Sequence, residues 1–99
     1  FKKEQSIYFI GDKGVRIGKV LSIFIDRLRV SSLGGESIYV KESDCFQMVT
    51  ASDAQPLEQV SIQNGDTTLQ GEIVGYNEQA YIIKHQKQLL AVEKTAVIR

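Results

Sequence analysis

Apolar and polar residues alternate along short segments over almost the whole chain, and turn-forming residues separate these segments. Alternation with a period of two residues is typical of a β-strand that buries one face. In segment 26–30, Leu28 and Val30 share one face, and Arg27 and Arg29 share the other. The pattern therefore predicts an all-β protein. The expected strands are residues 6–10, 15–24, 26–30, 37–40 and 45–49, then 60–63, 69–74, 79–84, 89–92 and 96–98.

The turns and the glycines within strands add detail to this pattern. Residues 41–44 form a tight polar turn, where one turn of 3₁₀ helix is expected. Residues 75–78 are expected to turn the chain between two later strands. Gly18 lies in the middle of a long β-branched stretch, and Gly71 lies at the centre of the expected strand 69–74. A glycine inside a strand often marks a sharp bend in a small barrel, which predicts strongly curved sheets.

The strand pattern stops near the middle of the chain and then starts again. Residues 51–57 contain Pro56, the chain's single proline, and read as a linker with room for one helical turn capped by Ser52 or Asp53. The expected domains are residues 1–50 and 58–99.

The two expected domains resemble each other when the chain is shifted by about 53 positions. Gly18 then falls on Gly71, and Val30 falls on Ile83. The number of strands, the glycine within a strand and the polar turn before the last strand all recur. A unit of about 45 residues has little core of its own and usually packs against a neighbour. The repeat therefore predicts two very small domains in tandem.

Composition narrows the functional classes. The chain has 99 residues, 42% of them hydrophobic, and 12 basic residues balance 12 acidic ones, so any basic surface must be local. With only Cys45 and His85, we expect no disulfide, no metal site and no cofactor, and no catalytic arrangement is visible. No apolar run is long enough to span a bilayer, so we expect a cytoplasmic, non-enzymatic protein without membrane contact. The start at Phe1 indicates a segment of a longer chain.

A family resemblance lies in the second half. The run Val60-Ser61-Ile62-Gln63-Asn64-Gly65, followed by Leu69-Gln70-Gly71-Glu72-Ile73, resembles the first Sm motif of the bacterial RNA chaperone Hfq family, and Ser6-Ile7-Tyr8 is similar to the opening of that motif. The resemblance implies two tandem Sm-like (SH3-like) five-stranded small β-barrels. It also implies single-stranded RNA as a partner and self-association into a ring, in which three two-barrel chains imitate a hexamer.

On one face of the family's rings, a tyrosine stacks on adenines and the glutamine of Leu-Gln-Gly reads them. Tyr8 matches that tyrosine in the first copy, where Ile17 replaces the glutamine. Gln70 matches the glutamine in the second copy, where Ser61 replaces the tyrosine. Neither copy has both residues, so an alternative interpretation is that Tyr8 is an ordinary strand aromatic.

On the other face, the family uses a Lys-His pair before the last strand. Lys41 retains positive charge at that place in the first copy, whereas Glu93 reverses it in the second. Arg27 and Arg29 share one strand face and are a candidate phosphate-binding stripe, although solvated charges that protect an edge strand are the more common explanation. The candidate RNA-binding residues are Tyr8, Arg27, Arg29, Lys41 and Gln70.

Three functional hypotheses follow from these observations. The first is a ring-forming, Hfq-like protein with an RNA-binding or RNA-regulatory role. The second is a protein-interaction adaptor whose barrels have lost RNA binding, which the neutral charge and the missing Lys-His pair favour. The third is a structural domain of a larger chain.

Overall fold

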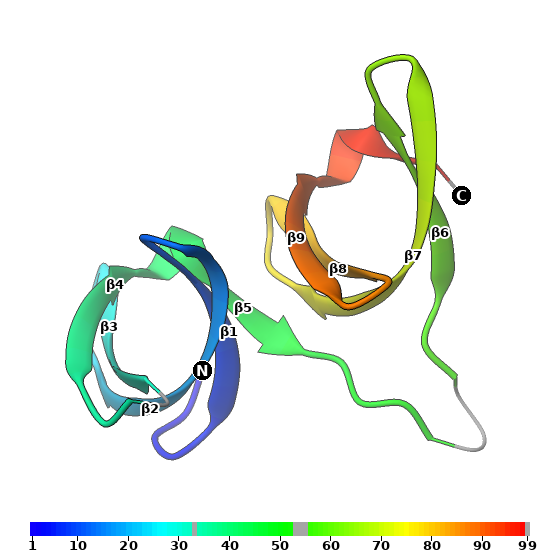
Figure 1. The fold of residues 1–99 in the computed structure, drawn as a ribbon. Coiled ribbons are helices and arrows are strands. Elements are labelled where there is room, and N and C mark those ends of the chain that lie inside the picture. Colours follow the sequence, from blue (N-terminus) through cyan, green and yellow to red (C-terminus); the bar gives the residue numbers. More distant parts are fainter. Residues whose placement is uncertain (33, 53–55, 99) are drawn as a thin grey trace. The chain divides into compact units, whose positions relative to one another are not determined.

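The computed structural model of the chain describes residues 1–32, 34–52 and 56–98 and divides into two compact units, Phe1–Met48 and Val49–Arg99 (Figure 1). Almost all regular structure in both units is antiparallel β-sheet, so the predicted all-β class is confirmed. Residues 53–55, which belong to the linker expected at 51–57 and include the proposed cap Asp53, lie outside the described residues.

The first unit is a five-stranded antiparallel sheet in which β2 lies at the centre of the strand order β5-β1-β2-β3-β4. The sheet curls round on itself, but the described residues show no ladder joining β4 to β5, so the strands do not close into the barrel that the sequence led us to expect (Figure 1). The elements are β1 (Ser6–Gly11), β2 (Gly14–Ile23), β3 (Arg27–Ser32), β4 (Ser37–Lys41), the 3₁₀ helix η1 (Glu42–Asp44) and β5 (Cys45–Met48).

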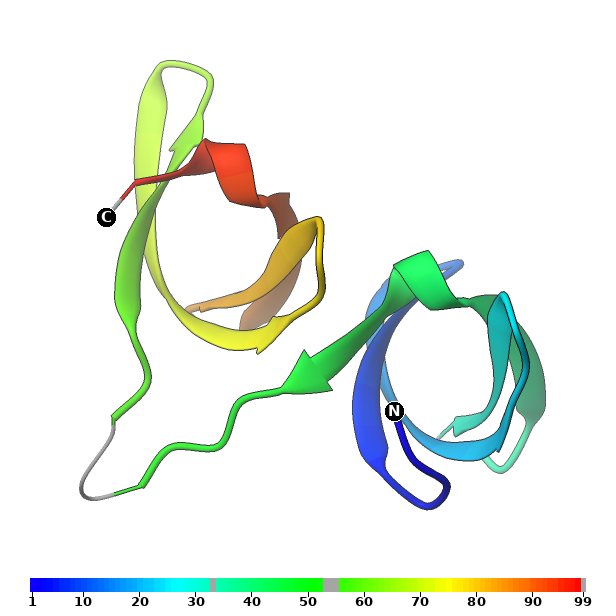
Figure 2. The same cartoon turned by 180° about the vertical axis from the view of Figure 1, so that it is seen from behind.

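The second unit has the same architecture, with strand order β10-β6-β7-β8-β9 and a similar curl (Figure 2). The described residues again show no ladder between the two end strands, β9 and β10. The elements are β6 (Gln59–Asn64), β7 (Thr67–Tyr76), β8 (Ala80–His85), β9 (Gln88–Glu93), the 3₁₀ helix η2 (Lys94–Ala96) and β10 (Val97–Ile98).

The two units also agree in register. Ser6 lies opposite Lys19 in the β1–β2 pair, and Gln59 lies opposite Glu72 in the β6–β7 pair, so both partners are offset by 53 residues. The ladder shifts at the equivalent place in the next pair of each unit, which indicates a β-bulge there. The same backbone path is thus built twice from sequences that share few identical residues.

Each unit has its own hydrophobic core, made by the inward faces of the strands. Leu28 and Val30 are buried while Arg27 and Arg29 are exposed, as the alternation predicted. The first core consists of Ile7, Phe9, Val20, Leu28, Val30, Val40 and Cys45, with Phe1 and Ile38 packed against it. The second consists of Val60, Ile62, Ile73 and Ile83, with Val49, Leu69, Tyr81, Val92 and Val97 packed against it.

The glycines within β2 and β7 allow a neighbouring strand to approach closely. A methyl group on Gly18 would overlap the Val30 side chain and lie 2.8 Å from the Ser31 carbonyl oxygen. A methyl group on Gly71 would lie 2.6 Å from Ile83 Cγ2 and 2.7 Å from the Lys84 carbonyl oxygen. Real side chains do not tolerate such distances, so each glycine is required by the packing of β3 on β2, or of β8 on β7.

One expected turn begins later than predicted. The turn expected at 75–78 starts at Asn77, because the ladder between β7 and β8 resumes after the bulge and continues to the pair Tyr76–Tyr81. A bulge adds a residue to one strand without ending the pairing. A local sequence pattern contains no sign of that continuation.

Cys45 faces the core of the first unit, as predicted, and is fully buried. Its Sγ donates a hydrogen bond to the Lys41 carbonyl oxygen at 3.4 Å. Burial, together with the charges of Asp44 and Glu42, raises the pKa of the thiol to about 12. The thiol is therefore neutral in the folded chain over the physiological range of pH.

Replacing either buried glycine by alanine is expected to destabilise its unit. Gly18→Ala and Gly71→Ala should each lower the free energy of unfolding by about 1–3 kcal/mol, because the new methyl group forces the neighbouring strand outward. Urea unfolding followed by circular dichroism measures this. Gly34→Ala is the control: its nearest neighbour would lie 3.9 Å away, so its effect should stay within about 0.5 kcal/mol. Equal effects at Gly18 and Gly34 would contradict the packing argument.

The buried thiol predicts a pH-dependent contribution to stability. Its pKa is raised from 9.0 to about 12, so over this interval the unfolded chain loses a proton that the folded chain keeps. The stabilisation is complete below pH 9.0 and is lost as the pH rises towards 12. Unfolding measurements on the native chain and Cys45→Val should therefore show the native chain losing stability relative to the variant over this range. If the difference in stability between the native chain and Cys45→Val stays the same at every pH, the prediction is contradicted.

Candidate nucleic-acid interface

Three of the five candidate residues lie together on the outer face of the β3–β4 hairpin. Arg27 lies directly opposite Lys41, and Arg29 lies opposite Tyr39. All four side chains are exposed. Because residues that alternate along paired strands share a face, these side chains form one surface, which we call the β3–β4 outer face.

Two aromatic rings hold the Arg27 guanidinium on this face. The guanidinium carbon lies 5.4 Å from the centroid of the Phe24 ring and 5.2 Å from that of Tyr39. The two rings are themselves in contact, with centroids 5.9 Å apart and planes tilted by 52°. Cation–π contacts of this kind position a guanidinium while leaving its N–H groups available. We call Phe24, Arg27 and Tyr39 the ring cluster.

Arg29 is oriented by a neighbour on the opposite strand. Its Nε and Nη2 donate hydrogen bonds to the Ser37 hydroxyl oxygen, at 3.3 and 3.1 Å. A guanidinium has five N–H donors, so donors remain for a ligand after both bonds to Ser37 are made. Arg29 therefore presents a partly ordered cation beside the ring cluster.

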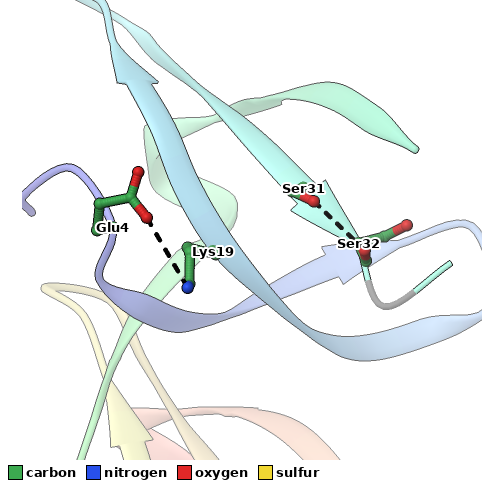
Figure 3. A network of polar contacts seen from close by, with 4 residues as sticks. All are labelled: Glu4, Lys19, Ser31 and Ser32. Atoms are coloured by element: carbon green, nitrogen blue, oxygen red, sulfur yellow. Dashed lines mark hydrogen bonds and ion pairs between the residues drawn. The ribbon is translucent and has the colours of Figure 1, made fainter. Parts of the chain in front are cut away.

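The positive charges on this face have no acidic partner among the described residues. The ion pair found among the described residues joins Lys19 Nζ of β2 to Glu4 Oε2 at 3.8 Å and involves none of these three cations (Figure 3). Asp26 and Glu42 adjoin Arg27 and Lys41 in sequence, but neither pair forms a salt bridge. Charges without an internal partner are available to an anionic ligand.

The turn between β2 and β3 extends this surface with apolar side chains. Ile23 and Phe24 are about half exposed, and Ile25 is 98% exposed. The backbone N–H of Phe24 donates to the Arg27 carbonyl oxygen at 2.9 Å, which closes the turn. Large apolar side chains grouped at the surface often mark an interaction site.

The equivalent face of the second unit lacks these groups. By register, Ala80 and Ile82 replace the two arginines, Ala91 replaces Tyr39, and Glu93 replaces Lys41. The turn differs as well, since Asn77 stands where the first unit has Phe24. On this face, cationic and aromatic groups therefore occur together in the first unit and not among the described residues of the second, whose cation–π contact joins Lys94 Nζ to the Tyr81 ring at 5.2 Å.

The remaining two candidate residues, Tyr8 and Gln70, lie on strands that do not belong to the β3–β4 hairpin. Tyr8 lies opposite Ile17 in the first unit, and Gln70 lies opposite Ser61 in the second. These are equivalent cross-strand pairs, so the structure brings tyrosine and glutamine together in neither unit. Tyr8 is half-buried, and burial raises the pKa of its phenol. Its ring is thus less open to stacking than that of Tyr39.

Sequence reasoning did not identify Phe24 and Tyr39 as candidate site residues. One signal was available for Tyr39: it alternates with Ser37 and Lys41 along one strand, which predicts a shared outward face. No comparable signal existed for Phe24, which the pattern assigned to the end of a strand. Its contact with Tyr39 depends on the pairing of β3 with β4.

The described residues contain no cluster of three or more His, Cys, Asp or Glu side chains that could hold a metal ion. His85 is engaged locally, with Nδ1 hydrogen-bonded to the Gln70 carbonyl oxygen at 2.6 Å. Within the described part of the chain, no helix has the length and apolar character of a membrane span.

No family model matches the chain, and no curated protein matches it either.

Proposed function

We propose that each unit is a Sm-like small barrel and that the chain binds single-stranded RNA through the β3–β4 outer face of the first unit. The role is binding within a cytoplasmic RNA-regulatory system rather than catalysis. The five-strand order found in both units, the 3₁₀ turn before each last strand and the motif resemblance around Gly71 support the Sm-like assignment.

The observation that carries the RNA proposal is the ring cluster with its neighbouring cations. Arg27 contacts two rings, and Arg29 and Lys41 complete a surface without acidic partners among the described residues. Cations contact phosphates, while aromatic rings stack on unpaired bases. Both types of group occur here on one pair of strands, whereas the chain as a whole is neutral.

The number of cations sets the expected strength of binding. Three phosphate contacts with a single strand correspond to a loss of about 2 logarithmic units of affinity for each tenfold rise in salt concentration. That is a modest electrostatic contribution, so one chain should bind weakly, with dissociation constants on the order of 1–100 µM. Several copies in one assembly would raise the avidity.

Self-association into a ring is part of this proposal. Within the described residues, β4 pairs only with β3, and β9 pairs only with β8. Such edge strands carry unpaired backbone groups that another copy of the chain can use. Three chains with two units each would then imitate a hexamer, and the binding face would alternate around the ring.

An adaptor function is the second candidate, and the β2–β3 turn favours it. Ile25 is 98% exposed beside two half-exposed apolar side chains. Surfaces that combine aromatic residues with arginine are also common at the centres of protein interfaces. RNA titrations distinguish the two candidates, because an adaptor without RNA binding shows no saturable signal.

Charge reversal on the β3–β4 outer face should weaken RNA binding and reduce its salt dependence. For Arg27→Glu combined with Arg29→Glu, the salt slope should fall by about 1.4, since two phosphate contacts are lost. Fluorescence anisotropy with A-rich and U-rich RNA at about 50 and 200 mM salt measures both quantities.

The matched control is Lys84→Glu combined with Lys87→Glu, which makes the same change of charge in the second unit. Both lysines are exposed, and their replacement should leave the slope within error of the native chain. If the native chain shows no binding at concentrations on the order of 50 µM in low salt, the RNA proposal is wrong.

The ring proposal predicts the mass of the particle in solution. Light scattering at micromolar concentration should give about three times the 11.1-kDa mass of the chain. Tyr39→Pro, which places a residue without an N–H group in the edge strand β4, should lower that mass towards a single chain. A native chain that is monomeric under these conditions would exclude the ring.

A further inference from the structure

We infer that the ring cluster is a stacking platform for one unpaired base and accepts single strands of RNA and of DNA alike. This inference rests on the proposed function and deepens it, because it names the part of the nucleic acid that the face contacts. It depends on Phe24 and Tyr39, which the phosphate-binding argument does not require.

The geometry of the cluster leaves ring surface open. Arg27 approaches both rings at similar distances, 5.4 and 5.2 Å, while the rings contact each other at 5.9 Å. The guanidinium and the rings thus form a compact triangle. Tyr39 is nevertheless 62% exposed and Phe24 42% exposed. A base that stacks on this surface lies next to a guanidinium with free donors, to which the adjoining phosphate can bind.

The second unit shows that the fold does not need an aromatic ring at this turn. Asn77 occupies the equivalent position, and its N–H donates to the Ala80 carbonyl oxygen at 3.0 Å, just as Phe24 donates to Arg27. In addition, Asn77 Oδ1 accepts hydrogen bonds from the N–H groups of Gln79 and Ala80, at 2.9 and 2.8 Å. Such an Asx turn is locally favourable. Phe24 adds no such bond and exposes a ring, so its presence is better explained by a ligand than by the turn.

The chemistry of the cluster defines the class of ligand. Every nucleobase has a π-face, and a guanidinium binds the phosphate of either backbone, so neither group distinguishes ribose from deoxyribose. The cluster therefore recognises an unpaired, stackable base rather than a sequence or a sugar.

The test replaces Phe24 by the residue that the second unit has at this position. Phe24→Asn should still fold, because asparagine can form the Asx turn seen at Asn77 and so offsets part of the ring contacts that are lost. Affinity is measured for oligo(A), oligo(dA) and an abasic deoxy-oligomer, each about 12 nucleotides long. The native chain should bind both base-containing strands similarly, and about 5- to 30-fold more tightly than the abasic strand.

For Phe24→Asn this preference for bases should largely disappear while the salt slope is unchanged. Tyr39→Ala, which copies Ala91 of the second unit, should act in the same direction. Tyr76→Asn is the matched control: it removes a ring of similar exposure that does not belong to the cluster, and affinity should not change.

The outcomes separate the inference from the proposed function. If the native chain binds no strand, both are overturned. If it binds base-containing and abasic strands equally, or if Phe24→Asn retains the full preference for bases, the platform is excluded while phosphate binding stands. If Phe24→Asn leaves nucleic-acid affinity unchanged and alters only the particle mass, the cluster is a protein contact and the inference is wrong.

Discussion

The close approach of β3 to β2, and of β8 to β7, is the constraint on which both units depend. It exists because Gly18 and Gly71 have no side chain where the neighbouring strand packs. β2 and β7 are each ten residues long and pair with strands on both sides. With that approach, a sheet of only five strands curls enough to enclose a core of its own. Without it the sheet would open, and a unit this small would have little interior to bury.

The repeated backbone leaves the two halves free to differ at the surface. Core positions are limited by volume, so Val20 and Val30 correspond to Ile73 and Ile83, which are similar in shape. Outward positions carry no such limit. The β3–β4 outer face is cationic and aromatic, whereas the corresponding positions of the second unit carry two alanines, the buried Ile82 and Glu93. Duplication of a fold followed by divergence of its surfaces would confine a binding function to one half.

Local alternation predicted the strands well because burial on one face is a property that each strand shows by itself. Leu28 and Val30 were placed inside and Arg27 and Arg29 outside, and the structure confirms all four. The prediction was wrong where pairing between strands determines the outcome. The turn before β8 begins at residue 77, because the ladder continues past a bulge that leaves no trace in the local pattern.

The candidate site likewise has a part that single strands predict and a part that the pairing of strands decides. Sequence alone supplied the strand carrying Arg27 and Arg29, because outward charges recur with a period of two, and it supplied Lys41 through the family resemblance. It assigned Tyr8 and Gln70 to the other face of the family's ring, one in each copy, and the structure places them at opposite positions of equivalent strand pairs in different units. The pattern contains no information about which distant residues a strand faces.

The sequence by itself therefore determined an all-β chain with two similar halves, buried glycines and the faces of individual strands, since these follow from burial and backbone geometry within each segment. Only the tertiary structure decided that Tyr39 meets Phe24 around the Arg27 guanidinium, because that contact depends on the register between β3 and β4 and on the turn that precedes them. Register is set by the packing of the whole sheet, and a shift of the register by one residue would move the side chains of the shifted strand to the opposite face.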